Sequence, residues 1–243
     1  MNDTVMGLYE RKSVRLFTDE PLTGEERDTI LRSAFEAPTA GNQQLYTIID
    51  VRDPQVRREL AVLCDGQDFI AAAPLVLVFL ADAKKWYDMY TYAGCSPRFP
   101  GTGDIILAVD DALIAAQNSV CAAWSMGIGS CYIGDVMENC EKMRELLRLP
   151  KYVFPAALVI YGRPTEGQLQ RRKPERLPEK HLVHIDRYTE MDETDLRELF
   201  SPKAGEKDLD EWMRTFCARK YDSGFSREMT RSVREYLRDY DPR

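Results

Sequence analysis

DIILAVDDALIAAQNSVCAAWSMGIGSCYIG, residues Asp104–Gly134, is the stretch on which the fold depends. No glycine or proline interrupts it between Ile105 and Met126, and Ala, Ile, Val and Leu dominate. Asp104 stands at its start, where an aspartate side chain caps a helix by accepting a bond from a backbone N–H. The stretch therefore predicts a helix about 33 Å long, at about 1.5 Å per residue.

The polar residues of this predicted helix recur seven positions apart and form one narrow stripe on an apolar rod: Asp110, Asp111, Gln117 and Asn118. A helix that is apolar nearly all round is buried on several sides. A membrane span is the alternative, but two aspartates, a glutamine and an asparagine within one span argue against it. We therefore expect a central core helix, with packing against a second subunit as a further option.

Glycines punctuate the segment after the helix, at Gly127, Gly129 and Gly134. They predict a helix stop, a short strand and a turn. Backbone without side chains would also let a flat ligand or a phosphate approach closely. The letters alone favour the first interpretation.

Composition places the chain among globular proteins of one large domain or one and a half. It has 243 residues, 44% hydrophobic and 30% charged, with a net charge of −7. This acidic balance argues against a nucleic-acid or anionic-membrane partner. No basic region precedes an apolar run at the N-terminus, so we expect no signal peptide and a cytoplasmic protein. Six cysteines without a CxxC pair, and only two histidines, predict reduced thiols and no metal site.

Basic residues gather at two places in this acidic chain, Arg11-Lys12-Ser13-Val14-Arg15 and Arg171-Arg172-Lys173…Arg176. Arginine offers forked donors and serine a small one, which suits a phosphate. A solvated basic helix end is the other explanation of the first run, and these five residues alone favour it.

A polar loop at residues 37–44 joins a predicted helix, capped at Thr23, to a predicted strand at 46–51. Neutral amides and hydroxyls on a loop suit the edge of a heterocycle, which presents donors and acceptors but little charge. Turn chemistry alone is the other explanation. Two further apolar runs, 75–80 and 156–162, predict buried strands.

Four motifs in order, RKSVR (11–15), PTAGNQQ (38–44), YIG (132–134) and KPERLP (173–178), resemble the nitroreductase family of FMN-dependent oxidoreductases. The resemblance spans roughly residues 5–190. It implies an α/β (α+β) fold, a three-layer sandwich with a central, mainly antiparallel sheet flanked by helices. It also implies an intertwined homodimer with an FMN in each of two pockets at the subunit interface.

The cofactor-binding residues come from the same resemblance. Those implied to hold the phosphate are Arg11, Lys12, Ser13, Arg15, Lys173 and Arg176. Those implied to contact the ring and ribityl chain are Pro38, Thr39, Asn42, Gln44 and Gln67, with Tyr132, Ile133 and Gly134 beside them. Asp135 stands where many relatives have a second glycine, and Glu175 interrupts a common Lys-Pro-Arg sequence.

Two segments lie outside these motifs. Residues 84–103 place aromatics among glycines and prolines, which predicts either an aromatic cover over a flat cofactor or a helix followed by a loop. Residues 191–243 predict a helical C-terminal extension after the FMN-binding domain 1–190, packed on its own or the partner subunit.

The resemblance implies that hydride moves from NAD(P)H through flavin to a nitroaromatic, quinone or flavin acceptor in a ping-pong cycle. No side chain need act as an obligatory acid or base. The alternatives are a reductive dehalogenase-like or flavin-destroying member of the same fold, a flavin-binding protein without turnover, and a scaffold without flavin.

Overall fold

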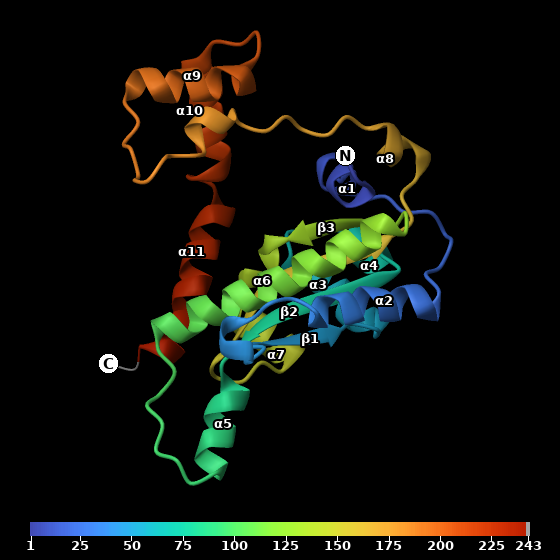
Figure 1. Ribbon diagram of the computed structural model, residues 1–243, viewed down its shortest axis with the longest axis vertical. Coiled ribbons are helices and arrows are strands. Elements are labelled where there is room, and N and C mark those ends of the chain that lie inside the picture. The colour runs from blue at the N-terminus through green and yellow to red at the C-terminus, as the bar shows by residue number, and fades with distance from the viewer. Residues whose placement is uncertain (242–243) are drawn as a thin grey trace. The chain divides into compact units, whose positions relative to one another are not determined.

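The computed structural model describes residues 1–241, and its contacts divide the chain into two units (Figure 1). The first unit comprises Met1–Arg171 together with the chain from Met229 onward, and the second comprises Arg172–Glu228.

A four-stranded antiparallel sheet forms the centre of the first unit, in the order β1-β2-β4-β3. The strands are β1 (Tyr46–Asp50), β2 (Leu75–Asp82), β3 (Gly129–Ile133) and β4 (Val153–Gly162). Every residue of the two central strands is buried. Strands covered on both faces need apolar side chains at all positions, which is why β2 and β4 are unbroken apolar runs. The register shifts once, opposite Pro155, whose missing N–H suits such an irregularity.

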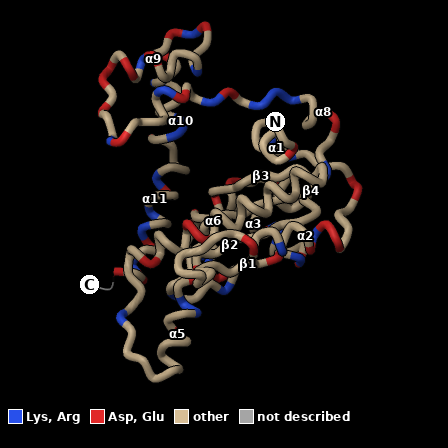
Figure 2. The backbone as a smooth tube through the Cα atoms, in the orientation of Figure 1, with Lys and Arg blue, Asp and Glu red and all other residues tan. Residues whose placement is uncertain are grey.

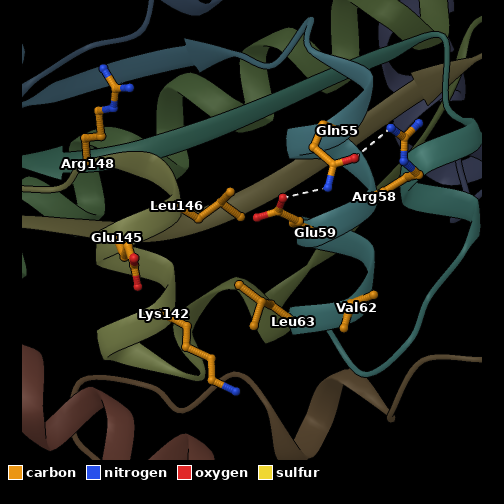
Figure 3. A pocket seen from close by; sticks show the side chains of 9 residues that line it. All are labelled: Gln55, Arg58, Glu59, Val62, Leu63, Lys142, Glu145, Leu146 and Arg148. Carbon is orange, nitrogen blue, oxygen red and sulfur yellow. Dashed lines mark hydrogen bonds between the residues drawn. The ribbon is translucent and has the colours of Figure 1, made fainter.

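Helices flank this sheet, and the predicted sandwich is confirmed. Helix α6 (Thr102–Ser125) packs on all four strands and beside α2 (Gly24–Phe35). Figure 3, seen from α3 (Pro54–Leu63) and α7 (Cys140–Leu147), shows the strands behind these two helices. The smaller helices of this unit are α1 (Asp3–Glu10), α4 (Phe69–Ala72), α5 (Lys84–Tyr92) and α8 (Glu166–Gln170).

The central helix differs from its prediction at its start. It begins at Thr102, so Asp104 is its third residue rather than its cap. Asp104 still satisfies a terminal donor, because its carboxylate accepts the N–H of Gly101 at 2.7 Å. The polar stripe is also not uniform, since Asp110 is exposed whereas Asp111 is buried.

Among the described residues, α6 is the one helix long and apolar enough to cross a membrane, and 44% of its apolar window is buried within the chain. Core helices of globular proteins meet the same criterion, so length and composition do not distinguish the two.

The chain from Met229 onward packs on its own first unit through the end of α11 (Gly224–Leu237) and the turn Arg238–Tyr240. Tyr236 is fully buried and meets the ring of Phe154 edge-on. The hydroxyl of Ser232 accepts the N–H of Cys140 at 2.9 Å. The second unit contains the turn Glu179–His181, α9 (Glu193–Ala204), α10 (Leu209–Lys220) and the start of α11.

Candidate functional site

The first basic run is a loop attached to the edge strand β3. The N–H of Val14 donates to the carbonyl of Ser130 at 2.9 Å, and Ser13 forms a parallel bridge with the same residue. Gly129 makes this approach possible, because a Cβ there would lie 2.6 Å from Cγ2 of Val14. Gly129, one of the glycines that follow the central helix, therefore lets the loop 11–15 pack against β3.

A second glycine allows a similar close approach further along the chain, at Phe17. Phe17 bridges to Pro164, and a Cβ on Gly162 would lie 2.6 Å from the Phe17 ring. Glycines at the ends of β3 and β4 thus let the segment 13–17 lie directly against the sheet.

A third attachment comes from α8. The ammonium of Lys12 donates to the carbonyls of Leu169, at 2.6 Å, and of Arg171. The guanidinium of Arg171 donates to the carbonyl of Ser13. Lys12 is therefore engaged within its own chain, and its contact with a phosphate remains a prediction.

The side chains of Arg11, Ser13 and Arg15 converge on β3. Burial raises the pKa of the Cys131 thiol, while Arg15 and a hydrogen bond with Ser13 lower it, which places both beside the sulfur. Burial likewise raises the pKa of Tyr132, and the nearby charge of Arg11 opposes that rise. The structure brings these predicted phosphate ligands and Tyr132 together.

Arg11 supplies the test of whether this loop suits an anion. Its Nε is buried and has no hydrogen-bond partner. A buried donor without an acceptor costs free energy, on the order of 1–3 kcal/mol, unless a ligand provides that acceptor. A phosphate oxygen is such an acceptor, so the orphaned donor fits FMN at this loop.

Gln67 lies near the same end of the site, since Arg15 stacks over the ring of Phe69 at 5.9 Å. The amide nitrogen of Gln67 donates to the carbonyl of Cys64 at 2.7 Å and to the carboxylate of Asp135. Both N–H groups are then used, so the amide oxygen is the group that Gln67 offers a ligand. Asp135 thus meets Gln67, which explains how a carboxylate is accommodated at this position.

The predicted ring-binding loop has a strained backbone. Its centre is the turn Ala40–Asn42, and φ is +56° at Asn42 and +49° at Gln44. Non-glycine residues in this left-handed region are uncommon and persist where surrounding contacts hold them. Pro38, Asn42 and Gln44 are exposed, and the Thr39 hydroxyl accepts the N–H of Gln44 at 3.2 Å.

Two distant residues hold this loop. The carboxylate of Asp111, in the middle of α6, accepts the N–H of Ala40 at 2.9 Å and that of Leu45 at 3.0 Å. The indole N–H of Trp86, on α5, donates to the carbonyl of Gln43 at 2.7 Å. The sequence predicts neither role. An aspartate in an otherwise apolar helix was the one available signal, and it did not identify the partners.

The remaining predicted residues lie as follows. Ile133 is buried and ends β3, and Gly134 begins a turn through Met137. A Cβ on Gly134 would make only an ordinary contact of 3.7 Å, so its backbone does not require glycine. Lys173 and Arg176 belong to the second unit, on the basic stretch after α8 (Figure 2).

The two groups of predicted residues meet α6 at different levels. Arg11 lines a cavity of about 760 Å³ together with Cys121 and Trp124. The ring-binding loop meets α6 at Asp111. Ten positions separate residue 111 from residue 121, roughly 15 Å along a helix axis.

The segment 84–103 consists of α5, a loop and the first two residues of α6, and its role as a cover over the cofactor stays a prediction. The rings of Trp86, Tyr87 and Tyr90 on α5, with Pro97 and Pro100 from the loop, line a cavity of about 300 Å³. Gln43 lines it too, so this aromatic cavity adjoins the ring-binding loop.

Another cavity, of about 760 Å³, lies between α3 and α7 and holds none of the predicted site residues (Figure 3). Its rim is made of long polar side chains that pair with one another, such as Gln55 with Glu59 and Arg58 with Gln55. This groove lacks the orphaned donor that marks the basic loop, and we do not assign the site to it.

Comparisons with known proteins agree with this geometry. A family model described as "Nitroreductase family" matches residues 8–163. The chain is 33% identical to "FMN reductase (NADPH)" of Bacillus subtilis over 246 residues, covering 99% of this chain and 96% of that one. It is 34% identical to "Oxygen-insensitive NADPH nitroreductase" of Salmonella typhimurium over 194 residues, 79% and 78% of the two chains. The solved NfrA1 nitroreductase from B. subtilis superimposes with a TM-score of 0.82 at 29% identity, over 97% and 98% of the two chains.

Proposed function

The chain belongs to the nitroreductase family, and we propose on this basis that it is an NAD(P)H-dependent flavin oxidoreductase with FMN as its cofactor. The observation that carries the proposal is the basic loop 11–15, tied to β3 and α8, with the buried Nε of Arg11 left without an acceptor. The sequence relatives described above are both named for NADPH, so we expect NADPH to be the faster donor.

The residues present divide the work of binding FMN. Arg11, Ser13 and Arg15 would take the phosphate through charge-assisted hydrogen bonds. Thr39, Asn42 and Gln44 would take the ring edge with neutral groups, and Gln67 would offer its oxygen to a donor on the ligand. Lys173, Arg176 and the division into an FMN-binding region 1–190 and an extension 191–243 remain part of the proposal.

When bound, FMN would supply the hydride chemistry for electron transfer from NAD(P)H to a nitroaromatic, quinone or flavin acceptor, in the ping-pong cycle that we propose. The protein's task is to bind, orient and exclude water. The aromatic cavity beside the loop, lined by Trp86, Tyr87 and Tyr90, suits a small aromatic acceptor.

We further propose that two copies of the chain form the homodimer. Ile106, Leu107, Leu113 and Ile114 are exposed on α6, each pair seven positions apart, so they line one face of the helix. A second α6 would cover this apolar face. Sedimentation of the purified protein tests the proposal, and a monomer at micromolar concentration would reject it.

An absorption spectrum followed by anaerobic addition of NADPH and NADH tests the activity. We expect oxidised-flavin bands that bleach on addition, faster with NADPH. Flavin bands that neither donor bleaches would mean a binding protein without this turnover. A protein that stays free of FMN after reconstitution would overturn the proposed function.

A further inference from the structure

A charged side chain lies buried at the centre of the apolar helix α6. Asp111 is 3% exposed, while its neighbour Asp110 is exposed to solvent. Burying a carboxylate is costly unless hydrogen bonds replace its water. Asp111 has both its oxygens satisfied by backbone donors, Ala40 at 2.9 Å and Leu45 at 3.0 Å.

These two donors bracket the strained part of the ring-binding loop. Between them lie Asn42 and Gln44, both with positive φ although neither is glycine. Such conformations relax unless the chain on either side is fixed. Asp111 fixes it at Ala40 and at Leu45, and Trp86 fixes it between them through the carbonyl of Gln43.

We propose that Asp111 is a positioning residue, which holds the loop 39–45 in the strained conformation that presents Thr39, Asn42 and Gln44 to the flavin ring. The inference rests on the proposed function, since it names what the loop is held for. Asp111 acts through the backbone of the loop and does not itself contact the cofactor.

A carboxylate is the side chain that this position requires. Two backbone N–H groups need two acceptors, and an ionised aspartate has two oxygens and no donor. Asparagine has the same shape but one oxygen, so its NH₂ would face one of the two N–H groups. The substitution Asp111→Asn therefore removes one restraint with almost no change in volume.

The charged and titratable groups that face Asp111 fit this role. The ammonium of Lys85 interacts with the carboxylate across the protein interior and donates to the carbonyl of Tyr46 at 2.6 Å. The Asp111 charge also raises the pKa of the Tyr46 phenol, after the larger effect of burial.

The experiment compares Asp111→Asn with Asp28→Asn, the same substitution at an exposed position on α2, away from the apolar face of α6. Hydrogen exchange of the peptide spanning residues 38–46 is measured on the FMN-free proteins, and FMN affinity by titration. We expect D111N to exchange this peptide at least about tenfold faster and to bind FMN at least about tenfold more weakly, the loss of one bond to a charged acceptor. D28N should match the wild type in both measurements.

The visible spectrum of bound FMN is the readout that a purely structural role would not move. We expect a shifted flavin band in D111N and none in D28N. A D111N protein with lower thermal stability but unchanged FMN affinity and spectrum would overturn the proposal. Unchanged exchange of residues 38–46 would overturn it as well.

Trp86→Phe is the second variant, for the case that D111N does not fold. It removes the one hydrogen bond from the Trp86 indole to the carbonyl of Gln43. We expect faster exchange of residues 38–46 and weaker FMN binding in W86F, and no change in either would count against the positioning of this loop. If wild type and D28N both fail to bind FMN, the proposed function and this inference fall together, a result distinct from a loss confined to D111N.

Discussion

The basic loop 11–15 and the ring-binding loop 39–45 are each held in one conformation, but by different kinds of contact. The basic loop is fixed by backbone pairing to its neighbour β3 and by Lys12, a member of the loop itself. The ring-binding loop is fixed by Asp111 and Trp86, which come from other parts of the chain. The charged loop is held in part by a side chain of its own, Lys12, whereas the neutral loop is held by side chains from α5 and α6.

This difference has an energetic consequence. Charges in the basic loop make strong, forked bonds that need modest pre-organisation. Neutral amides and hydroxyls bind more weakly, so the ring-binding loop gains most from being held rigid before the ligand arrives. Substitutions in the first loop should act directly on binding, and those around the second should act through mobility.

The largest expected effect is at Arg11. Arg11→Ala removes the guanidinium with the orphaned Nε, and FMN affinity should fall about 10- to 150-fold, the equivalent of about 1.5–3 kcal/mol for bonds to a charged group. Fluorescence titration with FMN measures it. Arg32→Ala, an exposed arginine on α2, is the control. Equal affinity in R11A and wild type would remove Arg11 from the phosphate site.

Lys12 should behave differently from its neighbour. Lys12→Ala breaks the bonds to the carbonyls of Leu169 and Arg171, so we expect the free energy of unfolding of the FMN-free protein to fall by about 1 kcal/mol. FMN affinity should fall less than in R11A. Chemical denaturation and the same titration check this. A loss of affinity as large as in R11A, with stability unchanged, would make Lys12 a direct phosphate ligand and break the comparison.

Asp135 offers a smaller and more specific effect. Asp135→Asn keeps an acceptor for the amide of Gln67 but removes the charge that strengthens the bond, so the side chain of Gln67 is held less firmly. FMN affinity should fall a few-fold, about 0.5–1 kcal/mol. Gln67→Ala should show a larger loss, and combining it with D135N should add little. Additive losses would mean that Asp135 acts independently of Gln67.

The smallest expected effect concerns the stability of the protein at Glu141, which lies outside both loops. The guanidinium of Arg231 hydrogen-bonds the Glu141 carboxylate and holds its pKa at about 2, below its ordinary 4.5. Because the folded value is the lower one, the stabilisation is present above pH 4.5 and is lost as the pH falls towards 2.

Glu141→Gln should therefore be slightly less stable than wild type at pH 7, and the two should converge near pH 2. Urea midpoints across this range, with Glu145→Gln as the exposed control on the same helix, measure the difference. A difference that persists unchanged down to pH 2 would show that the carboxylate charge is not its source.

Local sequence patterns predict an element correctly where the residues that stabilise it are close in sequence. Thr23 and Glu26 form the expected capping box at the start of α2, and the unbroken apolar runs become the buried strands β2 and β4. The sequence predicts Asp104 as the cap of α6, whereas it is the third residue of that helix, because the sequence signals for these two positions overlap.

By itself the sequence determined the central helix, the buried strands and the basic loop, since periodicity, apolar runs and adjacent charges are properties of neighbouring residues. The sandwich was implied by the resemblance of four motifs to the nitroreductase family. Only the tertiary structure decided which groups hold the ring-binding loop. Asp111 lies 71 and 66 positions from the two residues whose N–H groups it accepts, and Trp86 lies 43 from its acceptor. The N–H groups that a buried carboxylate accepts are brought to it by the tertiary fold, so no local sequence pattern identifies them.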